Sequence, residues 1–288
     1  MPEGPECARI ADTLNYYLQN KYLMGGTFYP QVNLDGSDSK KFGTNLIPVM
    51  CHLKHGSKVI RIYAQAKRVI FELEINNQRY YIASFLAMTG HWLRYIPKST
   101  IMELKFCDTN PKLTRLNIVT ERIYYEDIRK FGFFQIHLTA QSLEKVFKKI
   151  GPDLLHTEVT LQQYYQVIRT PKLFQLTIDA FLLEQEYFSG IGNYLKSEIL
   201  YQCRIAPMRT LGSLTDTDIV NLLTNSSHLI RYAYQCNGLT IGDYIDPNGN
   251  KGVYKPLVYS QPQDPEGRPV HTTNSGERTT HWVPGYQV

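Results

Sequence analysis

The chain begins MPEGPE, and these first residues could perform covalent chemistry. Processing normally removes an initiator methionine before a small residue such as proline, so we expect Pro2 to carry the free amine. An α-amine has a pKa of ~7.7–8.0, against ~10.4 for lysine, so part of it is unprotonated near neutral pH. Because this amine is secondary, its attack on a carbonyl or sugar carbon gives an iminium ion, which is an electron sink that needs no added proton.

Two acids accompany this amine. Glu3 is adjacent to Pro2 and could move protons for it, and Glu6 lies one helical turn further on and could share the face of Glu3. The positive amino end of a helix would also favour the neutral amine. However, a proline followed by acids is also a common helix start. Taken alone, these residues favour a helix start over a reactive amine.

A second stretch, SGIGNY at residues 189–194, combines two glycines with Asn193 at the start of an apolar helical pattern. Free backbone N–H groups at a helix start, together with an amide side chain, suit a phosphate group. A tight connection between two helices explains the same residues equally well. The stretch is not a dinucleotide-binding fingerprint, because no strand leads into it and GxGxxG is absent.

Four further residues could contact a nucleic acid. Lys67 lies within a strand run and could meet a phosphate, or it could be a solvated edge charge. Met88 precedes Thr89-Gly90 at an expected strand–turn junction, and Arg129 and Phe131 lie in EDIRKFGFF. Apolar wedges and an arginine can fill the gap left by an extruded nucleotide. Singly, each of these residues is more often part of the core or of an ordinary surface.

Composition restricts the class of protein. The chain has 288 residues, of which 43% are hydrophobic and 20% charged, which is enough for one large or two ordinary domains. No apolar run approaches the ~20 residues needed to cross a bilayer, and the start lacks the regions of a signal peptide. We therefore expect an intracellular protein with no membrane partner. The net charge of +5 fits an ordinary basic surface or a polyanionic partner.

The five cysteines are far apart and form no CxxC pair, so we expect neither a disulfide framework nor a zinc ribbon. Cys51, His52 and His55 have ligand-like spacing but lack a fourth ligand nearby. The prediction is that the chain holds no metal and no other cofactor.

The elements that would position these residues change type along the chain. A helical pattern at 5–23 ends at Gly25-Gly26, and β-rich runs follow at 58–75, 79–96 and 115–138, with a turn at the sequence NNQ. Short strands with polar turns and one helix predict an antiparallel β-sandwich. The fold class is therefore α+β, with an N-terminal sandwich flanked by helices.

Helical patterns dominate after residue 140. The first lies in 142–155, with Ser142 as N-cap and a stop at Gly151-Pro152, and others follow in 160–170, 172–188, 189–205 and 213–238. The last residues read as a β-hairpin, with turns at DPEG and NSGE. We expect domains at 1–139, 140–254 and 255–288, the last being the hairpin.

Together, these motifs resemble the formamidopyrimidine-DNA glycosylase/endonuclease VIII family. The resemblance covers nearly the whole chain in order: PEGPE, a lysine in a strand hairpin, MTG, RKFG, IGPDLL, LLEQ…SGIGNYLKSEIL and GERTTHWVPGYQ. PEGPE at the start and GIGN downstream are together highly specific for this family, whereas either motif alone would be a weak indication. The resemblance implies a helix-two-turn-helix element at about 142–204.

The resemblance also implies a bifunctional enzyme, a DNA glycosylase and AP lyase of base excision repair, acting on damaged DNA as a monomer. Pro2 would be the nucleophile, Glu3 and Glu6 the assisting acids, and Lys67 a phosphate contact. Asn193 and Arg278 would hold the DNA backbone. Met88, Arg129 and Phe131 would fill the void left by the flipped base. This matches the chemistry already inferred for Pro2 and reverses the preference for a simple helix start.

Two departures from the family pattern bear on the substrate. No cysteine follows Cys236, so the terminal hairpin cannot be a four-cysteine zinc finger, and His271 and His281 alone do not make a metal site. The hairpin instead resembles the zincless finger of the endonuclease VIII-like branch, which favours oxidised pyrimidines and ring-opened purines. Phe85 occupies a position that is often polar in the family, so we do not expect a phosphate contact there.

Two other functions compete with this one. A catalytically silent DNA-damage-binding module on the same scaffold would tolerate loss of Pro2 or Glu3, yet it has no use for an intact PEGPE. A small-molecule tautomerase also uses an N-terminal proline, but such enzymes are short chains of β-α-β units. We therefore expect the chain to act on DNA, in a nucleus, in microbial cytoplasm or in a viral factory.

Overall fold

The computed structural model describes residues 2–29, 53–113, 118–240, 244–275 and 278–288. The chain divides into two compact units, which we describe separately. The sheet unit contains Pro2, Glu6–Lys148 and Thr240–Val253, and the helical unit contains Glu3–Pro5, Lys149–Leu239 and Tyr254–Val288. The sequence grouped 240–253 with the helices, whereas this segment packs with the sheet unit; Arg94, for example, donates its N–H to the carbonyl of Pro247 at 2.8 Å.

The first helix, α1, spans Gly4–Leu18 and is shorter than the predicted 5–23. The chain turns at Asn20, which has a φ of 68°, and then enters a strand. Gly25 and Gly26 lie inside that strand, where the register shifts between Leu23 and Gly25. The prediction that these glycines end the helix was therefore wrong; they accommodate a bulge.

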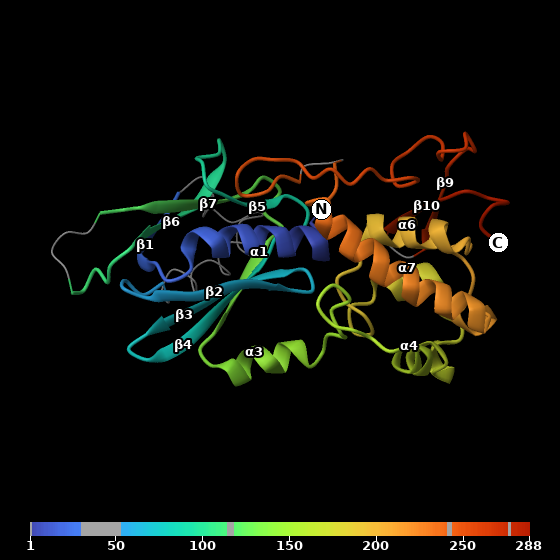
Figure 1. Cartoon of the computed structure of the whole chain (residues 1–288), viewed down its shortest axis with the longest axis horizontal. Helices are drawn as coiled ribbons and strands as arrows, with labels where there is room; N and C mark the ends of the chain where they lie inside the picture. The colour runs from blue at the N-terminus through green and yellow to red at the C-terminus, as the bar shows by residue number, and fades with distance from the viewer. Residues whose placement is uncertain (1, 30–52, 114–117, 241–243, 276–277) are drawn as a thin grey trace, which may run out of the picture. The chain divides into compact units, whose positions relative to one another are not determined.

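Among the described residues, eight strands form one antiparallel sheet in the order β5-β7-β6-β1-β2-β3-β4-β8 (Figure 1). They are β1 (Tyr22–Phe28), β2 (Lys58–Gln65), β3 (Arg68–Ile75), β4 (Gln78–Phe85), β5 (Gly90–Leu93), β6 (Thr100–Cys107), β7 (Glu121–Asp127) and β8 (Phe133–His137). The sequence runs contained all of these except β1 and β6. The predicted turn at NNQ joins β3 to β4 through Asn76 and Asn77, both with positive φ.

The sheet folds on itself into a sandwich. Strands β1 and β2 share a single residue pair, Tyr22 with Lys58, so the ladder nearly breaks there. The two outermost strands then meet through aromatic rings: Trp92 of β5 lies 6.0 Å from Phe134 of β8, between ring centroids. The predicted antiparallel sandwich is therefore confirmed.

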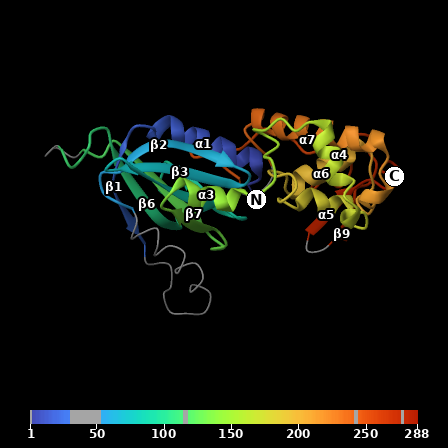
Figure 2. The same cartoon turned by 90° about the horizontal axis from the view of Figure 1, so that it is seen from below.

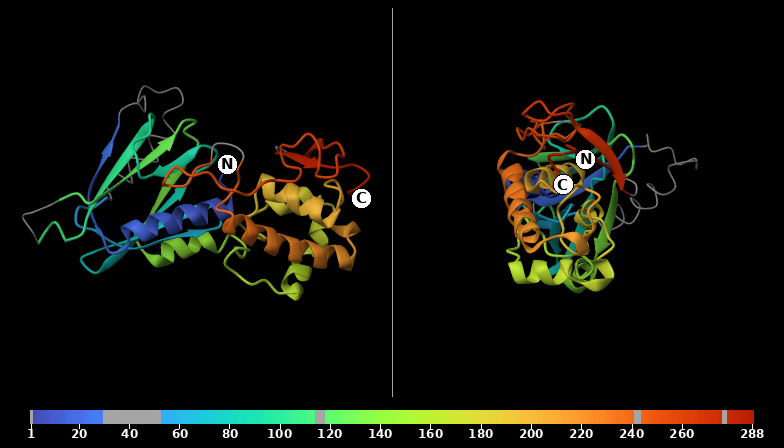
Figure 3. Two further views of the ribbon diagram at one scale, coloured as in Figure 1. Left: turned by 45° about the horizontal axis from the view of Figure 1, so that its top comes forward. Right: turned by 90° about the vertical axis from the view of Figure 1, so that its right-hand side faces the viewer.

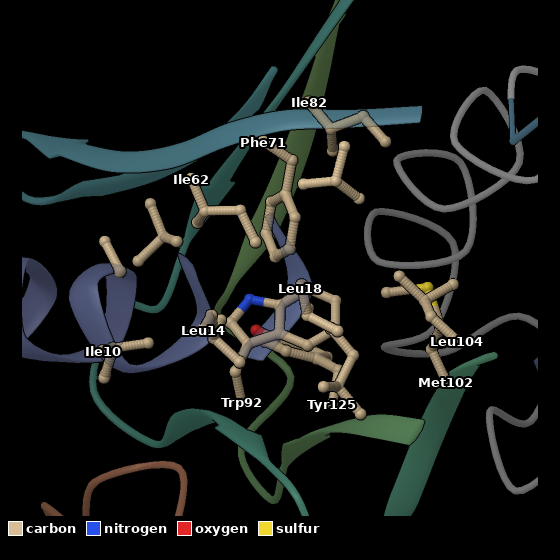
Figure 4. Packing of buried hydrophobic residues seen from close by; sticks show 14 of the residues in the cluster. Ile10, Leu14, Leu18, Ile62, Phe71, Ile82, Trp92, Met102, Leu104 and Tyr125 are labelled. Atoms are coloured by element: carbon tan, nitrogen blue, oxygen red, sulfur yellow. The ribbon is translucent and has the colours of Figure 1, made fainter. Parts of the chain in front are cut away.

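The core of the sheet unit lies between the two halves of the sandwich and α1. Figure 4 shows Phe71, Ile62 and Ile82 on one side and Trp92 and Tyr125 on the other, with the leucines of α1 beside them. Alternation along β3 fits this arrangement, because Val69, Phe71 and Leu73 face this core whereas Ile70 faces a second cluster.

Helix α3 (Ala140–Phe147) covers that second cluster (Figure 2). Its N-cap is Thr139, whose side chain accepts a hydrogen bond from the backbone of Ser142. The sequence assigned the cap to Ser142, three residues late. The hydroxyl of Ser142 instead lies 3.1 Å from Nδ1 of His137.

The helical unit contains the remaining elements, and Figure 3 shows α6 beside α7 with the terminal hairpin over α6. They are α4 (Leu161–Ile168), the 3₁₀ helices Pro171–Leu173 and Leu211–Ser213, α5 (Ile178–Leu183), α6 (Asn193–Cys203), α7 (Asp216–Gln235), β9 (His271–Ser275) and β10 (Arg278–Trp282). The predicted helix at 172–188 is reduced to α5. In the part of the chain that the structure describes, no helix has the length and apolar character to span a membrane.

Candidate active site and nucleic-acid interface

Glu3 is anchored by several backbone groups of one helix start. Its side chain is buried, and its carboxylate accepts hydrogen bonds from the backbone N–H groups of Gly192, Tyr194 and Leu195, at 2.7, 2.9 and 3.4 Å. These groups form the amino end of α6, where the helix dipole favours a negative charge. Glu3 is therefore fixed by the helix that the sequence assigned to the DNA backbone.

The glycines of SGIGN make room for this contact. The N–H of Gly4 donates to the carbonyl of Gly190 at 2.8 Å, and a Cβ on Gly4 would lie 2.9 Å from the Cα of Gly190. A Cβ on Gly192 would lie 2.3 Å from Cδ of Glu3. Side chains at these positions would collide with the N-terminal segment, so the glycines serve that segment.

This geometry bears on one expectation. The sequence left two interpretations equally open for the start of α6, a phosphate site on its backbone N–H groups or a simple connection between helices; in the structure these N–H groups donate to the Glu3 carboxylate. The sequence could not distinguish the two anions, because either satisfies the free N–H groups of a helix start. A phosphate at this place would have to use side chains instead.

Asn193 and Arg278 lie together in the helical unit. Asn193 opens α6, and its Nδ2 donates to the carbonyl of Thr279 at 3.0 Å. Arg278, the residue before Thr279, is exposed at the start of β10. The pair predicted to hold a DNA backbone thus presents one anchored amide and one exposed guanidinium.

Glu6 and Lys67 belong to the sheet unit. Glu6 is buried in the first turn of α1. The pKa of Tyr244 is raised mainly by the burial of its own ring, and secondly by the negative charge of Glu6. Lys67 is half-buried in the turn between β2 and β3, following Ala66, which has a φ of 55°. Pro2 is buried and precedes α1. Met1 lies outside the described residues.

Met88 and Arg129 come together in the sheet unit, as the sequence motifs required. Nη1 of Arg129 lies 3.8 Å from Sδ of Met88, and Phe131, two residues on, is 61% exposed. Buried Asp127 organises both loops, because it accepts hydrogen bonds from the hydroxyl of Thr89 and the N–H of Gly132, at 2.6 and 2.7 Å. Met88 and Arg129 therefore lie together, and Phe131 is exposed two residues further along, in loops that Asp127 connects.

Phe85 has an apolar and cationic neighbourhood. Its ring stacks on Phe133 with centroids 4.0 Å apart, and the guanidinium of Arg68 lies 4.1 Å from its centroid. Burial lowers the pKa of Arg68 to about 10. Phe85 is half-buried and packs against these two neighbours.

No group of three metal-ligating side chains occurs among the residues that the structure describes. His281 pairs with Thr272 across the hairpin, and His271 pairs with Trp282. Of the cluster with ligand-like spacing, Cys51 and His52 lie outside the described residues.

Two family models match the sequence. The formamidopyrimidine-DNA glycosylase N-terminal domain matches residues 1–134, and the formamidopyrimidine-DNA glycosylase H2TH domain matches residues 150–244. The chain belongs to the formamidopyrimidine-DNA glycosylase family. The two matched ranges contain every predicted site residue except Arg278, which lies in the terminal hairpin.

Individual relatives agree with this assignment over the full length. The formamidopyrimidine-DNA glycosylase of Oceanobacillus iheyensis is 24% identical, covering 100% of this chain and 98% of the relative. A mutant Lactococcus lactis Fpg, solved with a Fapy-dG containing DNA, superposes with a TM-score of 0.80 at 22% identity, covering 99% of both chains. The wild-type Lactococcus lactis Fpg, solved with an oxidized pyrimidine containing DNA, gives 0.79 at 22% identity and the same coverage. These likenesses establish the fold.

Reasoning from the family motifs missed two buried charged residues on α6. Lys196 is fully buried, and its Nζ has no hydrogen-bond partner among the described residues. Burial lowers the pKa of Lys196 to about 8, although Asp179 and Glu3 act in the opposite direction. The pattern that could have revealed it is a lysine one turn after Asn193 in a helix that is otherwise largely apolar.

Glu198 is the second residue that was missed. Its carboxylate accepts hydrogen bonds from the N–H groups of Leu257, Val258 and Tyr259, at 2.8, 3.0 and 2.8 Å, and from the hydroxyl of Tyr254 at 3.2 Å. Burial raises the pKa of Glu198, and these four donors act against that rise. Glu198 thereby fixes the segment that leads into the terminal hairpin of this formamidopyrimidine-DNA glycosylase family member.

Proposed function

We propose that this chain is a DNA glycosylase of base excision repair with AP lyase activity, acting inside the cell on oxidised bases in DNA. Family membership supports the glycosylase class, and the Lactococcus lactis relatives were solved bound to damaged DNA. The observation that carries the proposal is the fixed position of Glu3. A carboxyl group held by three N–H groups directly follows the residue whose amine would react.

The reaction would begin at Pro2. Its unprotonated amine attacks C1′ of the damaged nucleotide, the new N–C1′ bond replaces the bond to the base, and the base leaves. The attacking nitrogen then loses its proton to Glu3, its lone pair opens the sugar ring by breaking the C1′–O4′ bond, and the same proton passes to O4′, which gives the iminium ion. Glu3 is suited to move that proton because it is held in one orientation.

Strand cleavage would follow from the same intermediate. The iminium ion withdraws electrons from C1′, so the C2′ proton becomes acidic and its loss expels the 3′ phosphate. A second elimination expels the 5′ phosphate. No cofactor is needed, because the secondary amine itself supplies the electron sink.

Holding a nucleotide outside the duplex requires further residues. Flipping a base costs a few kcal/mol, and least at a damaged pair. Met88 and Phe131 would fill the vacated space, with Arg129 against Met88 and near the unpaired base. Asn193, Arg278 and Lys67 would contact phosphates and hold the bent backbone.

The terminal hairpin bears on the choice of lesion. It lacks cysteine after Cys236, as in the endonuclease VIII-like branch that it resembles. We therefore propose oxidised pyrimidines and ring-opened purines as favoured substrates over 8-oxoguanine. A cleavage panel carrying thymine glycol, a hydantoin and 8-oxoguanine tests this choice, and fastest cleavage of 8-oxoguanine would contradict it.

Borohydride trapping on lesion-containing duplex tests the central step. Protein that begins at Pro2 should form a covalent adduct, whereas the same protein retaining Met1 should bind the lesion and form none, because its Pro2 nitrogen is an amide. Mass spectrometry distinguishes the two samples. Equal trapping by both samples would remove Pro2 as the nucleophile.

The same assay separates the enzyme from a catalytically silent DNA-damage-binding module. Such a module would bind the duplex and give no adduct even when it begins at Pro2. Binding should also depend on salt: about five phosphate contacts give a log–log slope near −4 to −5. A small-molecule enzyme with an N-terminal proline would show almost no such slope.

A further inference from the structure

Arg68 is a cation that the reaction proposed above does not use. It opens β3 directly after Lys67, and its side chain is half-buried. Among the described residues its guanidinium makes no hydrogen bond and no ion pair, and its Nε is buried without an acceptor. The other three arginines on strands of the described sheet, Arg61, Arg79 and Arg122, each pair with a glutamate. A buried donor without an acceptor is destabilising, so Arg68 requires an explanation that these three do not.

Two aromatic rings hold the guanidinium of Arg68. Its central carbon lies 4.1 Å from the ring centroid of Phe85, which faces Arg68 in the register of β3 and β4, and 5.9 Å from that of Phe147 on α3. The ring of Phe85 stacks in turn on Phe133. Contacts with ring faces explain where the cation lies, but they offer its five N–H donors no oxygen acceptor.

The fold brings Arg68 toward the amino end of α1. Strand β2 begins beside the end of that helix, where the N–H of Val59 donates to the carbonyl of Lys21 at 2.8 Å. It then runs back along the helix, since the N–H of Ile62 donates to Oδ1 of Asn15 at 2.6 Å. The turn between β2 and β3 therefore lies toward the end of the sheet unit where the chain begins (Figure 2).

Phe85 also connects Arg68 to the residues proposed above to fill the space of a flipped nucleotide. Met88 follows Phe85 by three residues. The carbonyl oxygen of Phe85 lies so close to Gly132 that a Cβ there would be 2.8 Å away, and Gly132 directly follows the exposed Phe131. Arg68 is thus linked, through the ring that holds it, to the loops of Met88 and Phe131.

The charge of Arg68 suits an anion. Burial lowers its pKa to about 10, with Cys7 acting in the opposite direction, so the guanidinium stays positive at neutral pH. A guanidinium presents a planar fork of donors that matches two oxygens of a phosphate, and stacking on a ring pre-organises that fork. Phosphate oxygens are also the acceptors that proteins contact most often along a DNA backbone.

We propose that Arg68 is a further DNA-binding residue: its guanidinium, held on the ring of Phe85, donates its N–H groups to a phosphate of the DNA backbone beside the damaged nucleotide. This inference rests on the proposed activity on damaged DNA. Arg68 binds the backbone in this scheme and takes no part in the covalent step.

The experiment measures binding to a duplex that carries an uncleavable abasic analogue, from about 50 to 200 mM salt, for wild type and Arg68→Met. Methionine keeps an unbranched, polarizable side chain against the two rings, so the packing should survive. We expect Kd to rise about 10- to 100-fold through loss of a charged hydrogen bond. The log–log salt slope should become shallower by about 0.9, the value for one phosphate.

Arg61→Met is the matched control. It removes the same charge from the same sheet, but Arg61 pairs with Glu72 at 2.6 Å and its side chain is 57% exposed. Its Kd and its salt slope should stay close to those of wild type. Any effect of overall charge would appear equally in both variants.

Arg68→Lys tests the planar contact without removing the charge. Lysine meets a phosphate as a point charge and lacks the fork, so we expect the salt slope of wild type with a Kd between those of wild type and Arg68→Met. Circular dichroism verifies folding. If Arg68→Met does not fold, Arg68→Lys decides, and a Kd equal to that of wild type would overturn the proposal.

The possible failures are distinguishable. Absence of any borohydride-trapped adduct with wild type that begins at Pro2 would overturn the proposed function. An adduct with wild type, together with the same Kd and salt slope in Arg68→Met and Arg61→Met, would overturn the role of Arg68 alone. The guanidinium would then serve only to pack on Phe85, and Arg68→Met would lower the free energy of unfolding without changing the salt slope.

Discussion

The two units of this chain bury carboxylates in different ways. In the sheet unit, Glu72 is buried but pairs with Arg61 and Arg79, whose side chains are 57% and 54% exposed, at 2.6 and 2.7 Å. In the helical unit, Glu3 and Glu198 are bound mainly by backbone N–H groups. The arginines that pair with Glu72 are themselves exposed to solvent. Glu3 and Glu198 instead connect separate segments of the chain inside the helical unit.

This difference predicts how strongly each carboxylate matters. Ion pairs that reach solvent contribute about 0–1 kcal/mol each, because water and salt screen them. A carboxylate that satisfies several buried N–H groups cannot be replaced without leaving donors unpaired, each at about 1–3 kcal/mol. Substitutions in the helical unit should therefore have much larger effects on stability and activity.

Gly192→Ala should have the largest effect. The added Cβ would lie 2.3 Å from Cδ of Glu3, so the carboxylate must leave its place on α6. We expect the rate of adduct formation to fall at least about 100-fold, since misplacement by about 1 Å has effects of that size. Single-turnover trapping measures it.

The control for this substitution is Gly212→Ala, where the nearest atom to the new Cβ, on Phe174, lies at 3.1 Å, so only a small adjustment is required. Its rate should stay within a few-fold of wild type. A Gly192→Ala protein as active as this control would show that Glu3 need not be held by α6.

Glu198→Gln should have the next largest effect, on stability. The amide NH₂ would face donors that now bind the carboxylate, leaving at least one N–H of the 257–259 segment unpaired. We expect the free energy of unfolding to fall by about 2–4 kcal/mol, measured by urea denaturation. Glu158→Gln, at an exposed position, should change it little. If both variants lost the same free energy of unfolding, the backbone contacts of Glu198 would not account for its effect on stability.

Lys196 gives a smaller effect with a distinctive pH dependence. Its pKa is about 8 in the folded state, lower than the ordinary value of 10.5, so between these values only the unfolded chain holds the proton. Stability from this group therefore rises with pH from about 8 to 10.5. Relative to Lys196→Met, wild type should gain roughly 3 kcal/mol across this window.

Urea denaturation of both proteins at pH 7.5, 9 and 10.5 measures that gain. The comparison cancels the titration of the tyrosines, which both proteins share. A difference between the two proteins that stays constant over the window would mean that Lys196 titrates as an exposed lysine does.

Local sequence patterns were sufficient for most elements of the fold. The alternation at 58–75 gave β2 and β3, and Asn76 and Asn77 gave the turn to β4, because local residues alone determine these features. The end of α1 was misplaced because Tyr22 and Leu23 continue a helical period. Their strand pairing with Cys107 and Phe106 is non-local and has no local pattern.

The sequence could propose the candidate site as a set of residues, but it could not reveal the contacts among them. Motifs identified Glu3 and Asn193, and the free N–H groups of α6 correctly indicated an anion. That the anion is Glu3 depends on a contact across 189 positions of sequence, which periodicity cannot reveal. Lys196 was missed for a related reason: the carboxylates that act on its pKa, Asp179 and Glu3, lie on other segments.

Glu72→Gln should have the smallest effect, and it tests the sheet-unit side of the comparison. Gln can still accept a hydrogen bond from one arginine, and both Arg61 and Arg79 reach solvent, where water replaces the lost ion pair. We expect the free energy of unfolding to fall by less than about 1 kcal/mol, and less again at high salt because exposed charges are screened. Urea denaturation at low and high salt measures both. A salt-independent loss as large as that of Glu198→Gln would mean that a buried carboxylate is equally critical whichever donors bind it, and that the contrast between the two units lies elsewhere.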